Sequence, residues 1–127
     1  MMNILVIDDN PMMRQMVVTG LSGNFDVREA RNGVEGLDLL AQHLPDIIVC
    51  DVAMPEMNGV ELLKRVRANP HTAAVPFLFL TAESSPNSRQ VSQEHGADGY
   101  LVKPFAMREL LRAVDTILRG RQAGVGD

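Results

Sequence analysis

The chain lacks three features that would each point to a specialised class of protein. Its single cysteine, Cys50, excludes an internal disulfide, and its place in an apolar run favours a small core residue over a nucleophile. No apolar run exceeds the length of a strand, and residues 1–3 lead directly into the first run, so neither a membrane span nor an export signal is indicated. The net charge of −4 provides no excess of basic residues for nucleic acid. These absences predict a cytoplasmic protein that makes no direct contact with nucleic acid or membrane.

What the chain does have is a regular alternation of short apolar runs with helical hydrophobic patterns. Its 127 residues, 46% of them hydrophobic and 22% charged, suit one compact domain. Apolar runs without strict alternation favour parallel strands that are covered on both faces. The predicted fold is therefore α/β, with three layers and a doubly wound, five-stranded parallel sheet. A strand order of 2-1-3-4-5 would open a crevice between strands one and three, where Asp8, Asp9 and Asp51 meet. The predicted strands are residues 4–7, 25–30, 47–50, 77–80 and 100–102.

Four helices are indicated by start signals and by the spacing of apolar residues. Three of them follow an asparagine, at Asn10-Pro11, Asn32-Gly33 and Asn58-Gly59, because Asn is a good N-cap and Pro suits the first turn. The last helix, from residue 107 to residue 118, has the clearest amphipathic face. The apolar residues assigned to the first three helices are Met13, Met16, Val17 and Leu21, then Val34, Leu37, Leu40, Ala41 and Leu44, then Leu62, Leu63 and Val66.

Two parts of the chain offer little apolar anchoring. The segment from Glu83 to Gly96 is rich in Ser, Gln and Asn, and Val91 is its one large apolar residue. An additional helix there, the fourth in chain order, would be weakly held, either as a surface helix at the edge of the sheet or as a movable element, and composition favours the former. After Leu118 the chain is expected to fray. The predicted organisation is a domain at 1–120 and a flexible tail at 121–127.

Polar residues stand where four of the predicted strands end: Asp8-Asp9, Asp51, Thr81 and Lys103. The carboxyl ends of parallel strands meet at one edge of a sheet, so these side chains should converge. Three neighbouring carboxylates repel one another, so either one stays protonated or a cation neutralises them. Mg²⁺ suits this position because it combines one or two carboxylates with phosphate oxygens. Lys103 and Thr81 would then bind a phosphoryl group, which an aspartate accepts as an acyl phosphate.

Taken singly, each of these residues has an ordinary structural explanation. A helix cap, the start of a loop, a solvated strand end or a half-buried core ring would account for Asp9, Asn10, Asp51, Thr81, Lys103 and Tyr100. Their joint occurrence at the ends of separate strands favours a common site. The histidines have no metal-ligand spacing and are assigned no role: His43, His71 and His95.

Four motifs occur in order along the chain: Asp8-Asp9, Asp51-Val52-Ala53-Met54-Pro55-Glu56-Met57-Asn58-Gly59, Thr81-Ala82 and Lys103-Pro104-Phe105. In this order they resemble the receiver domain of bacterial two-component response regulators, and the resemblance covers nearly the whole chain. It implies the five-stranded flavodoxin-like receiver fold. It also implies a phosphorylation-activated signalling switch, similar to the single-domain chemotaxis regulators, rather than an enzyme that turns over a substrate.

The resemblance assigns a role to each site residue. Asp51 would be the phosphoacceptor, with Mg²⁺ held by the carboxylates of Asp8, Asp9 and Asp51 and by the backbone carbonyl of Ala53. Thr81 would sense the phosphoryl group, Lys103 would pair with it, and Tyr100 would be the aromatic switch. The peptide bond between Lys103 and Pro104 is expected to be cis.

The partners follow from the same resemblance. The phosphoryl donor would be a histidine kinase or a histidine phosphotransfer protein. The output would be a downstream protein bound on the face formed by the fourth helix, the fifth strand and the fifth helix. The chain would assist its own phosphorylation and dephosphorylation. Two alternatives stay open, a phosphorelay shuttle and the N-terminal receiver of a larger regulator with a separate output domain.

Three rival functions use the same fold or the same residue types. An FMN-binding flavodoxin is disfavoured because two acids stand where a Ser/Thr/Gly-rich phosphate loop would follow the first strand. A Mg²⁺-dependent phosphatase with an aspartate nucleophile would want an acid-base residue two positions after Asp51, where this chain has Ala53. A module that binds Mg²⁺ but accepts no phosphate can be separated from a receiver by chemistry alone.

Overall fold

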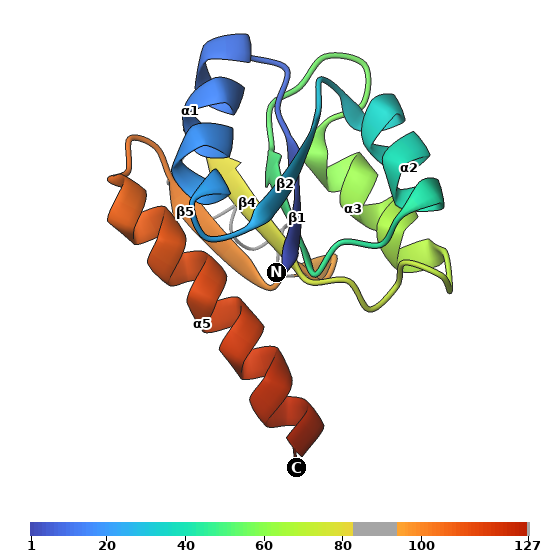
Figure 1. The fold of residues 1–127 in the computed structure, drawn as a ribbon. Helices are drawn as coiled ribbons and strands as arrows, with labels where there is room; N and C mark the ends of the chain where they lie inside the picture. Colours follow the sequence, from blue (N-terminus) through green and yellow to red (C-terminus); the bar gives the residue numbers. More distant parts are fainter. Residues whose placement is uncertain (83–93, 127) are drawn as a thin grey trace.

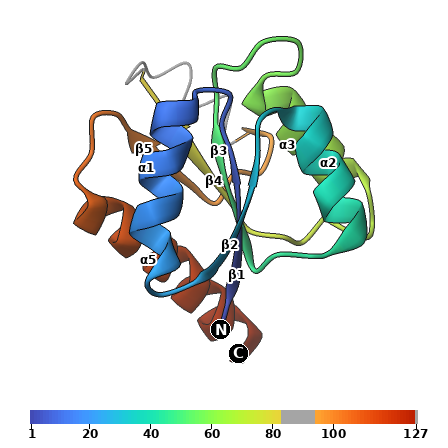
Figure 2. The ribbon, with the colours of Figure 1, turned by 45° about the horizontal axis from the view of Figure 1, so that its top comes forward.

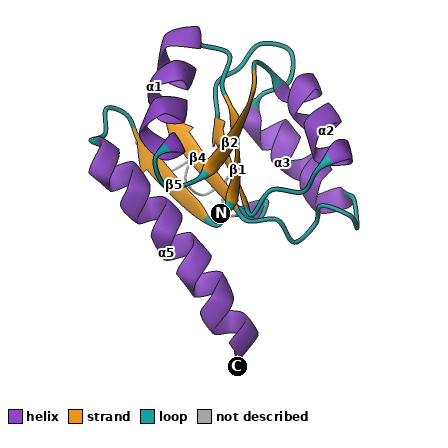
Figure 3. Ribbon diagram, viewed as in Figure 1, coloured by secondary structure: helices purple, strands orange, loops and turns teal. Residues whose placement is uncertain are grey.

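A five-stranded sheet lies between two layers of helices in the structure, a computed structural model that describes residues 1–82 and 94–126 (Figures 1 and 3). The strands are β1 (Asn3–Ile7), β2 (Asp26–Ala30), β3 (Ile47–Asp51), β4 (Phe77–Thr81) and β5 (Gly99–Val102). The helices are α1 (Pro11–Ser22), α2 (Gly33–Gln42), α3 (Gly59–Ala68) and α5 (Met107–Gly126). Most of the expected fourth helix, residues 83–93, lies outside the described residues.

The strands are all parallel and follow the order β2-β1-β3-β4-β5, which confirms the predicted topology. In the register, Ile7 pairs with Cys50, and Cys50 pairs with Phe79. Thr81 pairs with Val102 at the end of β5. The carboxyl ends of β1, β3, β4 and β5 therefore lie along one edge of the sheet, and Figure 2 shows the loops after β1 and β3 at that same end.

Each face of the sheet has its own core. Successive side chains of a strand point to opposite faces, so Ile4 and Val6 of β1 contact one core and Leu5 and Ile7 the other. α1 and α5 cover the first face, and α2 and α3 cover the second (Figures 1 and 2). Burial on both sides explains why β1, β3 and β4 read as continuous apolar runs rather than as alternating ones, whereas the edge strand β2 is mostly exposed.

Asparagine caps begin three of the helices, as predicted. The Asn10 side chain accepts hydrogen bonds from the backbone N–H groups of Met12 and Met13 at 3.0 and 3.1 Å, and Pro11 occupies the first turn of α1. Asn32 and Asn58 cap α2 and α3 in the same way, with distances of 2.8 and 2.9 Å. These caps set where each helix starts after a strand, and so they set the loops at the carboxyl edge of the sheet.

Some predicted inner-face residues point to solvent instead. Met16 of α1 is 44% exposed and Val34 of α2 is 54% exposed, while Leu44 lies beyond the end of α2. In α2 the buried face includes Gly33 and Gly36, and a Cβ on Gly36 would lie only 2.7 Å from the Ile7 side chain. Close backbone approach through glycine, together with the buried Leu40, therefore determines which face of α2 meets the sheet.

α5 continues to Gly126 and runs past the sheet (Figure 1), and the flexible tail expected at 121–127 stays a prediction. Arg119 pairs with Asp115 one helical turn earlier at 2.8 Å, which supports the helix where fraying was expected. α5 has 20 residues, yet neither it nor any other helix of the described part of the chain is apolar enough over a sufficient length to cross a membrane.

Candidate functional site

Three carboxylates meet at the carboxyl edge of the sheet. Asp8 follows β1, Asp9 comes next, and Asp51 is the last residue of β3. One oxygen from each lies within 4.8 Å of the others. Asp8 and Asp51 are buried, whereas Asp9 is exposed. The sequence-predicted convergence of the acids is therefore present, with one ligand candidate facing solvent and two set into the protein.

Lys103, the residue that follows β5, brings a positive charge into this cluster from a position two strands away from β3. Its Nζ donates a hydrogen bond to Asp51 Oδ1 at 3.2 Å and lies 4.0 Å from Asp8 Oδ2. The peptide bond from Lys103 to Pro104 is cis, as the resemblance implied. The ammonium group thus bridges the two buried carboxylates.

Thr81 lies between the strands that carry Asp51 and Lys103. It is the last residue of β4 and only 4% exposed, and its carbonyl accepts a hydrogen bond from the Lys103 N–H at 2.7 Å. Leu80, its neighbour, pairs with Asp51 in the sheet. The hydroxyl-bearing residue is therefore fixed beside the acids by the backbone ladder on both sides.

Two of the predicted site residues are placed differently from the rest. Tyr100 pairs with Phe79 inside the sheet, is half-buried and packs against the core under α2 and α3. Ala53 stands two residues after Asp51 in an exposed loop. The switch role of Tyr100 and the ligand role of the Ala53 carbonyl both stay predictions.

The Asp8 carboxylate is buried, and one of its oxygens has no hydrogen-bond partner among the described residues. Its Oδ1 accepts a hydrogen bond from the Asn10 N–H at 2.9 Å, but its Oδ2 is buried and has no hydrogen-bond partner among the described residues. Burial raises the pKa of Asp8, the charges of Asp51 and Asp9 raise it further, and the Asn10 hydrogen bond and Lys103 oppose them. A buried acceptor without a donor, next to two further carboxylates, fits a hard divalent cation such as Mg²⁺.

Replacing Asp8 with Asn is expected to stabilise the metal-free protein at neutral pH. Because the folded protein raises the pKa of Asp8, the unfolded chain loses that proton first, so stability falls as the pH rises from about the ordinary Asp value towards the raised one. An amide removes this cost and supplies a donor, for a gain on the order of 1 kcal/mol at pH 7.

Urea unfolding in chelator at pH 7 and at pH 4 would measure this effect. The difference between the Asp8→Asn variant and the parent should shrink at the lower pH, where Asp8 in the parent takes up its proton. A variant with a lower free energy of unfolding than the parent at pH 7 would show that the ionised Asp8 does not destabilise the folded protein.

The loop from β3 to α3 is held against the site by close packing. The Gly59 N–H donates to the Val52 carbonyl at 2.8 Å, and Glu56 adopts a positive φ of 69°. A Cβ on Gly59 would lie 2.6 Å from the Asp51 carbonyl oxygen and 2.7 Å from Phe79 Cε1. Sequence reasoning placed Gly59 after the cap Asn58 at the start of a helix, whereas its contact with the backbone of Asp51 required the structure.

Sequence reasoning missed Arg14, which contacts the backbone of the acid pair. Its Nη1 donates to the Asp8 carbonyl at 2.8 Å and its Nε pairs with Glu29 Oε1 at 2.9 Å. The Arg14 side chain is only 13% exposed. The available signal was its position three residues before the buried Val17, on the side of α1 that faces the sheet.

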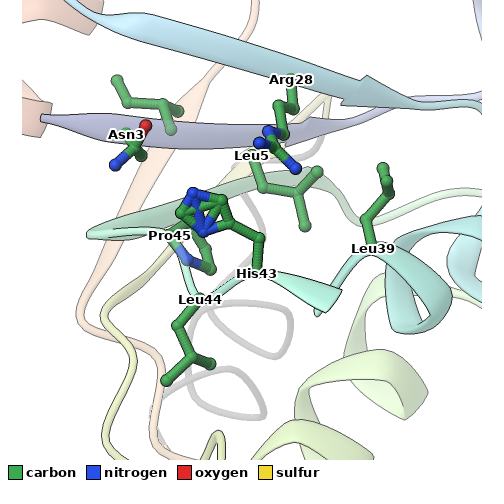
Figure 4. A pocket seen from close by; sticks show the side chains of 8 residues that line it. Asn3, Leu5, Arg28, Leu39, His43, Leu44 and Pro45 are labelled. Carbon is green, nitrogen blue, oxygen red and sulfur yellow. The ribbon is translucent and has the colours of Figure 1, made fainter. Parts of the chain in front are cut away.

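A small pocket at the opposite end of the strands does not compete with this site (Figure 4). It lies between the start of β1, Arg28 of β2 and the end of α2, and its walls include Leu5, Leu39 and Pro45. Its volume of about 10 Å³ has room for roughly one water molecule. It is far too small for a cofactor.

Comparison with known proteins identifies a family and solved structures with the same fold. The family model described as the response regulator receiver domain matches residues 4–115. The solved structure of the Vibrio cholerae chemotaxis protein CheY4 superposes with a TM-score of 0.88 and 37% identity, covering 92% of this chain and 98% of that one. The structure of a putative response regulator from Chloroflexus aurantiacus gives a TM-score of 0.88 and 38% identity, with 93% and 98% covered.

Curated relatives are longer than this chain. The response regulator MprA of Mycobacterium sp. (strain KMS) is 42% identical over 117 residues, which make up 91% of this chain and 50% of that protein. A probable cyclic di-GMP phosphodiesterase of Vibrio cholerae is 36% identical over 120 residues, which make up 94% of this chain and 27% of that protein. The chain thus spans half or less of the length of these relatives.

Proposed function

The chain belongs to the response regulator receiver domain family, and from that premise we propose that it is a phosphorylation-activated switch of a two-component system. Asp51 is the proposed phosphoacceptor. The observation that carries the proposal is the contact of Lys103 Nζ with Asp51 at 3.2 Å, inside a cluster whose other members are acids. A buried carboxylate held by an ammonium group beside a cation site is suited to accepting a phosphoryl group.

In the proposed reaction a carboxylate oxygen of Asp51 attacks the phosphorus of a phosphohistidine on the partner. The new oxygen–phosphorus bond forms as the nitrogen–phosphorus bond breaks. The electron pair of the broken bond returns to the imidazole nitrogen. Lys103 stabilises the charge on the phosphoryl oxygens, and the Thr81 hydroxyl donates to one of them. Asp8, Asp9, Asp51 and the Ala53 carbonyl would hold Mg²⁺, which when bound supplies further positive charge to those oxygens.

The partners are proposed from the family. A histidine kinase or a histidine phosphotransfer protein supplies the phosphoryl group in the cytoplasm, and a downstream protein binds the face that includes β5 and α5. A groove of about 400 Å³ between these two elements supports that face, and its lining includes Tyr100, Arg112 and Thr116. The chain assists its own phosphorylation and dephosphorylation and turns over no separate substrate. It acts alone, as a phosphorelay shuttle or as the receiver part of a longer regulator.

The proposed switch is a shift of population between two conformations. The aspartyl phosphate adds roughly 1.5 to 2 negative charges, and only a differential interaction with the two conformations shifts their equilibrium. Thr81 lies between Asp51 and β5, so its movement towards the phosphoryl group is suited to moving Tyr100 on that strand.

Replacing Thr81 with Ala is expected to preserve phosphorylation and weaken the response. The variant keeps Asp51 and Lys103, so it should gain one phosphoryl group, whereas the change of Tyr100 fluorescence on phosphorylation should fall to less than about half. Tyr100 is the single tyrosine and the chain has no tryptophan, so the signal is specific. A full response in the variant would remove Thr81 from the switch.

The intact mass of the protein after incubation with Mg²⁺ and a small acyl-phosphate donor tests the proposed function. We expect a gain of one phosphoryl group in Mg²⁺ and none in chelator. No gain in a folded protein that binds Mg²⁺ would favour an interaction module that works unmodified. Steady release of phosphate from small phosphoesters would favour a phosphatase, and a bound yellow chromophore would favour a flavodoxin.

A further inference from the structure

We propose that Arg14, held in place by Glu29, is a positioning residue for the cation site: it fixes the peptide unit that joins Asp8 to Asp9. The proposal rests on the proposed function in that the acid pair is taken to bind Mg²⁺. It assigns a role to two residues, on α1 and β2, that lie outside the acid cluster itself. Arg14 is largely buried, with 13% of its side chain exposed, and Glu29 is 52% exposed.

The Asp8 carbonyl lies where the strand pairing of β1 ends. The paired register of β1 stops at Ile7, opposite Ala30 and Cys50. The Asp8 N–H still donates to the Ala30 carbonyl at 3.1 Å. The Asp8 carbonyl is instead met by Arg14 Nη1 at 2.8 Å, so a side chain continues the ladder by one hydrogen bond.

This hydrogen bond constrains both acids at once. The Asp8 carbonyl and the Asp9 N–H belong to one planar peptide unit, so a rotation of that plane changes the direction in which the Asp9 side chain leaves the backbone. The Asp8 carboxylate is fixed separately, because its Oδ1 accepts from the Asn10 N–H at 2.9 Å. With both contacts in place, the two carboxylates keep their relative direction before any cation arrives, which lowers the cost of assembling the site.

Glu29 orients the guanidinium group of Arg14. Arg14 Nε lies 2.9 Å from Glu29 Oε1, so one planar group makes two contacts in different directions. Lysine cannot reproduce this geometry, because its ammonium group is a single point of charge. Glu29 also balances the charge of Arg14, so the pair adds no net positive charge next to a site for a cation.

That balance decides the design of the variants. Removing Arg14 alone would leave the charge of Glu29 unopposed and would attract cations, which would mask a loss of positioning. The double variant Arg14→Met/Glu29→Gln removes both contacts at constant net charge. The double variant Asp26→Asn/Arg28→Met is the matched control, since it removes one acid and one base from exposed positions of the same strand, β2.

Calorimetric titration with Mg²⁺ alone, on the folded 127-residue chain without phosphoryl donor, tests the proposal. We expect the dissociation constant of Arg14→Met/Glu29→Gln to rise about tenfold, the lower end of what loss of an outer-shell partner costs a metal site. Arg14→Lys should also bind more weakly although it keeps the charge. The control should bind like the parent.

Thermal unfolding with and without Mg²⁺ separates positioning from simple anchoring of α1. If Arg14 only ties α1 to the sheet, the variant unfolds at a lower temperature but binds Mg²⁺ with the affinity of the parent, and the proposal is overturned. If the parent binds Mg²⁺ but accepts no phosphoryl group, the proposed function fails while the effect of Arg14 on the affinity is still measured. A parent that does not bind Mg²⁺ overturns both.

Discussion

Replacing Asp51 with Asn is expected to abolish phosphorylation. The amide of Asn has the shape of the carboxylate but no anionic oxygen to attack phosphorus, so no acyl phosphate forms. Asp51 is 7% exposed and its Oδ1 accepts from Lys103 at 3.2 Å, a contact that the amide oxygen of Asn can keep. The variant should therefore fold, and intact-mass analysis with Mg²⁺ and an acyl-phosphate donor should show no gain.

The Asp8→Asn variant is the matched control for this experiment. It also removes one carboxylate from the same cluster, but it keeps Asp51, so its phosphorylation should be weakened through the metal and recover when Mg²⁺ is raised. The Asp51→Asn variant should not recover at any Mg²⁺ concentration. A phosphoryl gain in Asp51→Asn equal to that of the parent would place the acceptor on another residue and refute the proposed mechanism.

The α/β class and the convergence of the acids were predictable from the sequence because both depend on short-range patterns, whereas the strand order came with the family resemblance. Apolar runs of three or four residues with a polar residue after each are visible without a structure, and parallel pairing brings their ends together. The register then fixes the rest: Thr81 had to lie beside the acids once Leu80 paired with Asp51. Asparagine caps were predictable for the same reason, since each acts on N–H groups two or three residues away.

The contacts that could not be predicted are those that depend on how closely two elements approach. Val34 looked like an inner residue of α2, but Gly33 and Gly36 bring the helix backbone against Met57 and Ile7 and turn Val34 outward. Arg14 was not singled out in the sequence, because its partner Glu29 is on another element. Periodicity gives the faces of an isolated helix, whereas the distance between helix and sheet decides which face is used.

Gly59 shows how such a contact links the fold to the proposed chemistry. Gly59 is the first residue of α3. Because it has no side chain, the start of the helix can pack closely against the carbonyl of Asp51 and the ring of Phe79. A methyl group there would lie 2.6 Å from the Asp51 carbonyl oxygen and 3.0 Å from Val52 Cα, which are backbone atoms and cannot rotate away. Any relief of this overlap must therefore move either α3 or the end of β3.

Replacing Gly59 with Ala is accordingly expected to lower the free energy of unfolding by about 1 to 3 kcal/mol, the usual cost of overpacking. It should also slow phosphorylation of the folded protein, by up to about 100-fold if Asp51 moves by as much as 1 Å. Gly23→Ala is the control, because a Cβ there meets nothing within 4 Å and φ is −69°, so alanine should stabilise the protein by about 0.4 to 1 kcal/mol. Urea unfolding would measure both variants, and the dependence of the free energy of unfolding on urea concentration should stay unchanged. Equal stability of the two would mean that α3 yields to the methyl group at no cost, and that its packing does not hold Asp51.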